Sequence, residues 1–485
     1  MRLRLLPLLT AGLALAAPAL GAEISLDQAI EAAVAHSPQV VAQEAAIDVA
    51  RSERVIGRAH LRPVLQVTGD LKVWNQAQEV SFTGGGGGGL PSLPAPTTPY
   101  EAALAALLDG FSSPTRIQDQ ITAAFGASIM QPLTDLISTR STREALALGL
   151  DVAQAARAEA ARSAAVDAIA AWLRLHLALA LERSASQSVQ EYAPRLEQVD
   201  ALLAGGAALQ SDRLRLEVAQ ASAAQDLIAA RAQVATAQSV LATLMGLSPE
   251  QADELRPTPV DTTRCKADTT SVDALLSRAL DVRPELRGAR ASTRQAELGV
   301  DLARARMWPS VSAVAAYTHL EGQGLAVKDS AYVGLNLRWN AFEWGATREG
   351  ITIARARSRQ ADQQLRALTD RLRMQIASAQ QELRATAEVQ GVAALAETQA
   401  SESLRVESVR YGAGDATTTD VVTAEAALRR ARDQRVAAGF RCLLARATLG
   451  AAVGDTLRAS ELFDDGEGAP LTGPPDDGGI EGGER

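Results

Sequence analysis

The chain has 485 residues, of which 47% are hydrophobic and only 3% aromatic, and its formal net charge is −9. A net acidic chain does not favour nucleic acid as a partner. Its two cysteines, Cys265 and Cys442, could pair in an oxidising compartment, or they could be two buried thiols, because the sequence alone does not give the distance between them.

The first 22 residues have the pattern of a secretory signal peptide. Arg2 and Arg4 precede an apolar run at 5–17, and small residues lead up to Ala22, where cleavage fits. Loss of the two arginines would take the net charge from −9 to −11. No later continuous apolar run reaches the roughly 18 residues that a membrane helix needs. The mature chain would therefore enter a membrane only through β-strands.

The rest of the chain contains two copies of one plan, 23–250 and 271–455, separated by a linker at 251–270. At a constant offset of 246 (284 − 38), several residues match without a gap. Matched pairs include Ser25 with Ser271, Pro38 with Pro284 and Pro63 with Pro309. Prolines in register over about forty residues indicate an internal repeat.

Each copy predicts the same order of elements: two helices, two strands, a very long helix, a glycine turn and a returning helix. Ser25 and Ser271 are expected N-caps, and Pro38 and Pro284 separate the first two helices. The expected ranges in the first copy are 25–35, a second helix to 61, strands from 63 and at 123–133, and helices 134–204 and 211–244. Those in the second copy are 271–280, a second helix to 307, strands at 310–318 and around 333–339, and helices 346–411 and 419–449.

The predicted strands alternate in polarity, most clearly in the first and the last. Aromatic residues gather in or beside these strands: Trp74, Phe82, Phe125, Trp308, Tyr317, Tyr332, Trp339, Phe342 and Trp344. Strands favour aromatic residues in any case, but the scarcity of such residues in the long helices favours an aromatic girdle at a membrane interface.

Two segments depart from the repeat. The insert 84–122, between the first two strands, starts with six glycines and continues with several prolines, which predicts a flexible loop. No Lys-Ser or Lys-Thr follows the glycines, so this run is not a phosphate-binding loop. A short helix at 100–108 is expected within the insert. The tail 456–485 is acidic and rich in glycine and proline, which predicts disorder.

Four strands cannot close a membrane barrel, because closed barrels need about eight or more strands and an open edge is not tolerated in lipid. Several chains would have to pool their strands in a cyclic oligomer. The long helices also need partners, and hairpins from several chains would pack into a hollow cylinder.

This order of elements resembles the TolC family of outer-membrane efflux proteins over nearly the whole mature chain. The motifs that carry the resemblance lie at the opening of the first copy, at the strand-to-helix joints and at the second hairpin tip. They are Ile24-Ser25-Leu26-Asp27-Gln28-Ala29, Gln131-Pro132-Leu133-Thr134-Asp135, Trp339-Asn340-Ala341-Phe342-Glu343-Trp344-Gly345 and Arg410-Tyr411-Gly412-Ala413-Gly414.

The resemblance implies a mostly α fold with a β-barrel portion: a homotrimer with a shared 12-stranded transmembrane β-barrel, four strands from each chain, and an α-helical periplasmic tunnel. It implies an outer-membrane channel subunit of a tripartite efflux or type I secretion system. Its partners would be outer-membrane lipid, a periplasmic adaptor (membrane fusion) protein and an inner-membrane pump. The pump would supply the energy, so neither enzymatic activity nor a cofactor is expected.

The resemblance also assigns site residues. Tyr411 and Asp212 match a pair that holds the tunnel shut, and Asp420 matches an aspartate of the periplasmic constriction. Thr423 and Ala416 replace an acid and an arginine of that network, which weakens both the expected gate and the selectivity for cations that the resemblance implies. Both aspartates could instead be first-turn or capping acids. The predicted adaptor-docking tips are the glycine turns Gly205, Gly206, Gly412 and Gly414, which also supply turn geometry.

Other classes of function have less support. The four histidines are scattered, without metal-ligand spacing, and no nucleophile motif is present. The alternative is a soluble periplasmic coiled-coil scaffold or adaptor, but such a protein has no need of four amphipathic strands. The transported substrate cannot be read from the sequence.

Overall fold

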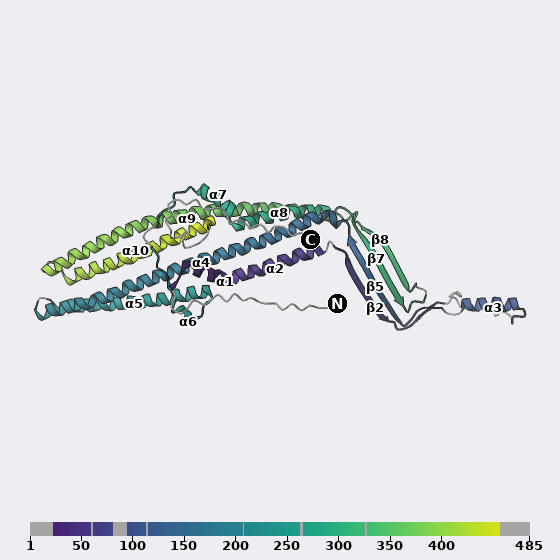
Figure 1. Cartoon of the computed structure of the whole chain (residues 1–485), viewed down its shortest axis with the longest axis horizontal. Helices are drawn as coiled ribbons and strands as arrows, with labels where there is room; N and C mark the ends of the chain where they lie inside the picture. The colour runs from purple at the N-terminus through teal and green to yellow at the C-terminus, as the bar shows by residue number, and fades with distance from the viewer. Residues whose placement is uncertain are drawn as a thin grey trace, which may run out of the picture. The chain divides into compact units, whose positions relative to one another are not determined.

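The computed structural model describes residues 23–59, 62–80, 95–112, 115–206, 208–261, 265–324 and 327–455 (Figure 1). The predicted signal peptide, the six-glycine run and the predicted disordered tail lie outside these residues. The chain divides into two compact units. One comprises Met1–Ile47, Val152–Arg290 and Gln363–Arg485, and the other Asp48–Asp151 and Ala291–Asp362.

The second unit contains one antiparallel sheet of four strands in the order β2-β5-β7-β8. These strands are β2 (Val64–Val73), β5 (Ile121–Pro132), β7 (Ser310–Glu321) and β8 (Asp329–Arg338). Figure 1 shows them side by side. Each copy of the repeat supplies one hairpin, and the two hairpins join through β5 and β7.

The register of this sheet places odd-numbered residues of all four strands on one face, since Leu65 lies opposite Ile129, Ile129 opposite Ala315, and Ala315 opposite Val333. That face is apolar and exposed along most of its length. Its large side chains are Leu65, Val67, Leu71, Val73, Phe125, Ile129, Val333, Leu335 and Leu337. The opposite face carries polar residues that include Gln66, Thr68, Asp70, Lys72, Asn336 and Arg338. The alternation predicted for the first and last strands holds in β2 and β8. It is less regular in the central strands, where β7 carries His319 and Glu321 on the odd-numbered face and Val314 and Leu320 on the other.

The insert 84–122 contains a helix where a short one was predicted, at 100–108, but it also contains strand residues that were not predicted. Strand β4 (Thr115–Gln118) pairs with β3 (Gln78–Val80), and β5 already begins at Ile121. Helix α3 (Pro99–Ser112) starts with a cap in which Thr98 Oγ1 accepts from the Glu101 amide at 3.3 Å. The Ile117 carbonyl accepts from the Gly324 amide of the other hairpin at 3.1 Å. Such contacts between distant segments leave no local signal in the sequence.

The short helices follow the repeat residue by residue. They are α1 (Leu26–His36) and α2 (Pro38–Ala59) in the first copy, and α7 (Val272–Val282) and α8 (Pro284–Ala305) in the second. Both pairs share an offset of 246 (272 − 26 and 305 − 59). Ser25 and Ser271 cap the first helix of each copy, and Ser25 forms a full capping box with Gln28.

Two long helical hairpins follow the strands. The first consists of α4 (Asp135–Ala204) and α5 (Gln210–Met245), and the second of α9 (Ala346–Ala413) and α10 (Thr418–Val453). At 1.5 Å per residue the 70 residues of α4 extend about 105 Å. Helix α9 begins directly after Trp344 and Gly345, whose φ angles of 52° and 91° turn the chain out of the strand. Helices α5 and α10 each have 36 residues and end at left-handed glycines, Gly246 and Gly454.

The apolar core of the first unit consists of two clusters. One surrounds Trp172 of α4, whose indole nitrogen donates to the Ile24 carbonyl at 3.2 Å. The other surrounds Leu286 and Ile376 and includes Cys442, which is joined to Cys265 by a disulfide with Cα atoms 6.0 Å apart. Two helices, within Arg140–Ala204 and Thr418–Val453, are long and apolar enough by composition to cross a membrane. The sequence analysis did not identify them, because it looked for continuous apolar runs. Their side chains supply much of this core, which explains their hydropathy.

The predicted linker 251–270 is also more structured than expected. Helix α6 (Pro249–Ala252) runs into it, and strand β6 (Arg256–Pro257) pairs in parallel with β1 (Glu23–Ile24). The Gln238 side chain of α5 donates to the carbonyls of Asp253 and Leu255 at 3.1 and 3.3 Å. This segment therefore packs against both the start of the described chain and the first hairpin.

Candidate functional site

The tip of the first hairpin is the turn between α4 and α5. Gly206 has a φ of 71°, which an L side chain rarely adopts, whereas Gly205 has no positive φ. Asp212, predicted as a gate residue, accepts a hydrogen bond from the Leu209 amide at 3.1 Å and lies 3.6 Å from Arg215. Its carboxylate thus satisfies a free amide at the start of α5, as a capping acid does.

The tip of the second hairpin has a tighter version of the same arrangement. Thr417 caps α10 and forms a capping box with Asp420: the Asp420 carboxylate accepts from the Thr417 amide at 2.8 Å and from its hydroxyl at 2.7 Å. These hydrogen bonds lower the pKa of Asp420, so its charge persists in acid. Gly414 turns the chain with a φ of 84°, whereas Gly412 lies inside α9 and has no turn conformation.

Tyr411 lies at the inner side of the second tip, where its hydroxyl accepts from Thr418 Oγ1 at 3.4 Å. It lines a cavity of about 300 Å³ between the two hairpins, together with Val199 of α4 and Leu216 of α5. No hydrogen bond joins Tyr411 to Asp212 among the described residues. The structure therefore places the predicted pair on facing hairpins and gives each residue a partner on its own hairpin.

Four polar contacts that the sequence analysis missed connect α10 to the first hairpin. Thr419 accepts from Arg215 at 3.0 Å, Glu425 pairs with Arg195, Arg429 donates to Asp226 at 2.5 Å, and Asp433 accepts from Ser184 at 2.7 Å. We call this set the inter-hairpin ladder. Glu425, Arg429 and Asp433 recur every four residues and so lie on one face of α10. That spacing was visible in the sequence, but nothing there identified the facing helix.

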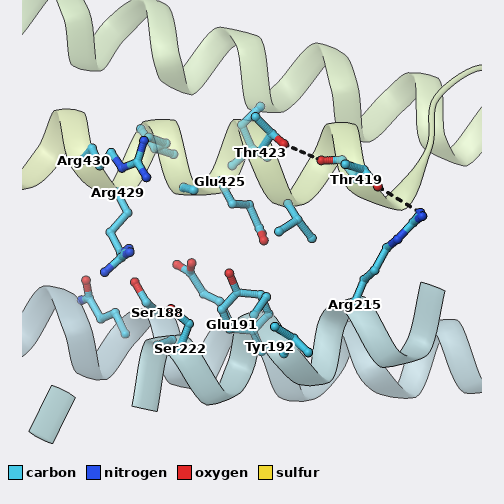
Figure 2. A pocket seen from close by; sticks show the side chains of 18 of the residues that line it. Ser188, Glu191, Tyr192, Arg215, Ser222, Thr419, Thr423, Glu425, Arg429 and Arg430 are labelled. Atoms are coloured by element: carbon cyan, nitrogen blue, oxygen red, sulfur yellow. Dashed lines mark hydrogen bonds between the residues drawn. The ribbon is translucent and has the colours of Figure 1, made fainter. Parts of the chain in front are cut away.

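A cavity of about 680 Å³ opens beside this ladder, bounded by α4, α5 and α10 (Figure 2). Figure 2 shows Glu425 extending from α10 toward Glu191 and Tyr192 of α4. Only 9% of Glu425 is exposed, and its burial raises the pKa of its carboxyl against the opposing effect of Arg195. Burial, and then the charge of Glu425, raise the pKa of Tyr192. Glu425 is thus the most buried acidic group of the described tip region.

The chemistry of the described residues is that of packing and ion pairing. Among them no group of three or more His, Cys, Asp or Glu side chains could hold a metal ion. His176 is enclosed between the rings of Trp172 and Phe440, with centroids at 4.2 and 5.8 Å, and burial lowers its pKa from 6.5 to about 4. It is therefore a neutral core residue at neutral pH.

Comparisons with known proteins agree with this architecture. Residues 275–455 match the family model for outer membrane efflux proteins. None of the curated proteins matches the sequence.

Several solved outer-membrane channels share the fold. VceC from Vibrio cholerae superposes with a TM-score of 0.68 at 19% identity, over 89% of this chain and 97% of VceC. CmeC from Campylobacter jejuni has a TM-score of 0.70 at 13% identity, covering 88% and 85% of the two chains. The open state of MtrE from Neisseria gonorrhoeae has a TM-score of 0.67 at 18% identity and covers 89% of each chain. The second copy thus matches the outer membrane efflux protein family in sequence, and the chain has the fold of solved outer-membrane channels.

Proposed function

We propose that three copies of this chain assemble into one conduit, in which a shared barrel of twelve strands crosses the outer membrane and the helical hairpins form a tunnel in the periplasm. The second copy matches the outer membrane efflux protein family, and the incomplete sheet needs strands from further copies. Three copies supply the twelve strands that the resemblance implies. Substrates would pass through it passively.

The observation that carries this proposal is the incomplete sheet of the second unit. Strands β2 and β8 each have only one neighbour among the described residues, so each leaves a row of backbone amides and carbonyls unpaired. Unpaired backbone groups cost several kcal/mol each in lipid. The exposed odd-numbered face is apolar, with 85% of Val333 and 75% of Val67 exposed. Pairing β8 of one chain with β2 of the next would remove every edge and turn this face to the lipid.

We further propose that the hairpin tips dock to a periplasmic adaptor that is joined to an inner-membrane pump, the source of energy. Gly205, Gly206, Gly412 and Gly414 lie at these tips. Repetition of the second tip around a threefold axis would bring three Asp420 carboxylates together. Carboxylates gathered at one constriction would favour cations, but Thr423 stands where the family pattern can carry a second acid, so the selectivity for cations is weaker than that pattern implies.

Fractionation of the cell envelope tests the assembly. We expect the protein in the outer membrane, migrating without heating as a species of three chains in mild detergent and conducting ions in a planar bilayer. A periplasmic monomer that does not conduct would contradict the proposal and would favour a coiled-coil scaffold.

The proposed gate has its own test. Tyr411 lines the cavity between the hairpins, and Asp212 lies on the facing hairpin. Replacement of both residues, Tyr411→Phe with Asp212→Ala, is expected to raise the single-channel conductance. An unchanged conductance would contradict a closing role for this pair.

A further inference from the structure

Helix α3 belongs to the insert of the first copy, whereas the second copy joins β7 to β8 through the short segment 322–328. Its start is specified locally: Pro99 occupies the first helical position, and the Glu101 carboxylate accepts from the amides of Thr97 and Thr98 at 2.8 and 3.2 Å. A helix of 14 residues is nevertheless marginal in water by itself. Packing against a partner would therefore stabilise α3.

One side of α3 is apolar and exposed. Tyr100, Leu104 and Leu107 are 77%, 45% and 59% exposed, so the part of the chain that the structure describes leaves them uncovered. The sequence continues the same spacing at Phe111. Steps of four, three and four residues follow one side of a helix and are the spacing of a coiled-coil interface. We call Tyr100, Leu104 and Leu107 the α3 stripe.

The charge of the insert argues against a lipid surface as the partner of this stripe. Residues 81–115 contain no lysine or arginine, whereas Glu101 and Asp109 are acidic. Hydrogen bonds from Thr97 and then from Thr98 lower the pKa of Glu101, so its negative charge persists in acid. Helices that lie on a membrane usually carry basic residues that attract anionic headgroups. An acidic helix with an apolar stripe is better suited to a protein partner.

The proposed trimer brings three copies of α3 to the same end of one barrel. The insert leaves the sheet between β2 and β5, at the end of β5 opposite to α4. Twelve strands spaced by about 4.8 Å and tilted by about 40° form a barrel with a radius of about 12 Å. Three helices packed about 9 Å apart would lie about 5 Å from the threefold axis, so the remaining distance is less than one helix diameter.

The attachment of α3 favours contact between copies. Only two residues separate the end of α3 at Ser112 from the start of β4 at Thr115. Such a short connection keeps the three helices of one trimer near one another, which raises their effective concentration. A helix too short to associate in free solution can then associate at the barrel.

We propose that the α3 stripes of three chains pack against one another around the threefold axis, at the outer end of the barrel. The partner that covers each stripe is thus a second copy of this chain. This inference rests on the proposed function, because only the shared barrel brings the three helices together. It gives the insert a role in assembly that is separate from the pairing of strands.

Cross-linking of the full-length protein in outer membranes tests this contact. Leu104→Cys places a thiol in the α3 stripe, whereas Ala102→Cys places one on the opposite side, because two residues turn a helix by about 200°. Both native cysteines are joined in the disulfide, so a short bismaleimide reacts with the introduced thiol alone. One linker joins two of the three chains in a trimer, so up to about two-thirds of Leu104→Cys is expected to migrate as a covalent pair. Ala102→Cys is expected to remain as single chains.

A second substitution tests whether apolar packing holds the helices together. In the Leu104→Cys background, Leu107→Glu is expected to abolish the covalent pair, because it would place three carboxylates together at the axis. Leu107→Met, which keeps an apolar side chain of similar volume, is expected to preserve it. The unheated trimer is expected in both variants, since the barrel is closed by its strands.

The outcomes separate the two proposals. A heat-sensitive trimer in which Leu104→Cys stays unlinked, or in which Ala102→Cys links equally well, would overturn the α3 contact and leave the proposed function intact. An unlinked Leu104→Cys that is also shielded from a charged maleimide would assign the stripe to lipid and overturn the contact in the same way. A protein that forms no trimer would overturn the proposed function and the contact with it.

Discussion

The disulfide between Cys265 and Cys442 allows a stability prediction with a magnitude. It joins the linker between the two copies to a cysteine of α10 that is fully buried, and its cysteines are 177 residues apart. In the chain-entropy model, closing a loop of that length lowers the entropy of the unfolded chain by roughly 17 cal/mol/K, which corresponds to about 5 kcal/mol at 25 °C.

Replacement of both cysteines by alanine is therefore expected to lower the free energy of unfolding of the helical unit by up to about 5 kcal/mol. The assay is guanidinium unfolding of detergent-solubilised protein, followed by circular dichroism at 222 nm. Each single replacement breaks the same bond, so the double variant is expected to lose no more than about 1 kcal/mol beyond Cys442→Ala alone. A reducing agent is expected to destabilise the wild type alone.

A destabilisation below about 1 kcal/mol would refute this reasoning, since removal of a native disulfide usually costs 2–5 kcal/mol. Such a result would mean that the linker is already restrained in the unfolded ensemble. Alternatively, its non-covalent contacts through β6 and Gln238 would be enough to keep the folded state stable without the disulfide.

Three further predictions concern the sheet, the gate and the core. Val67→Arg on the apolar face is expected to destabilise the assembled barrel by about 2–4 kcal/mol, whereas Gln66→Arg on the opposite face is expected to be tolerated; equal yields of unheated trimer for the two variants would contradict the assignment of the faces. Tyr411→Phe and Asp212→Ala are each expected to raise single-channel conductance less than the double variant does, and a decrease for either would argue against a closing role. The pKa of His176 is about 4 in the folded chain and near 6.5 in the unfolded chain. As the pH falls, the imidazole is therefore protonated in the unfolded chain before it is protonated in the folded chain, which favours unfolding. Stability is then expected to fall by about 3 kcal/mol as the pH drops from 6.5 to 4, and His176→Phe is expected to flatten this part of a pH series of unfolding curves; a wild type as stable at pH 4 as at pH 6.5 would contradict the assignment.

The repeat explains why most of the helices could be predicted from the sequence. Prolines and capping serines recur at one offset, and each creates a local boundary that needs no tertiary contact. Helices α1, α2, α7 and α8 accordingly begin at the predicted positions. The offset falls from 246 for these helices to 208 (418 − 210) for α5 and α10, a difference of 38 residues that corresponds to the insert in the first strand hairpin.

The elements that were missed depend on distant partners. Strand β6 exists because Arg256 and Pro257 come together with Glu23 and Ile24, and β4 exists because it pairs with β3. Short segments of this kind carry no periodicity that a local pattern can reveal.

The candidate site likewise contains residues whose role follows from local sequence and residues whose role depends on distant partners. The glycine turns and the capping acids at the tips are local features. Asp212 and Asp420 lie in the first turn of α5 and α10 and accept from the backbone amide that precedes each helix, in accordance with the alternative interpretation of these residues. The Arg195–Glu425 pair was not predictable, because the sequence does not show which face of α4 meets α10. Burial of Glu425 follows from that packing alone.

The central claim is that several copies of this chain complete one barrel. Native mass spectrometry of the protein extracted from the outer membrane in mild detergent tests it most directly. A complex of three chains that dissociates on heating is the predicted result. A monomer in the outer-membrane extract would contradict the shared barrel, because the edges of β2 and β8 would then have no partner in lipid.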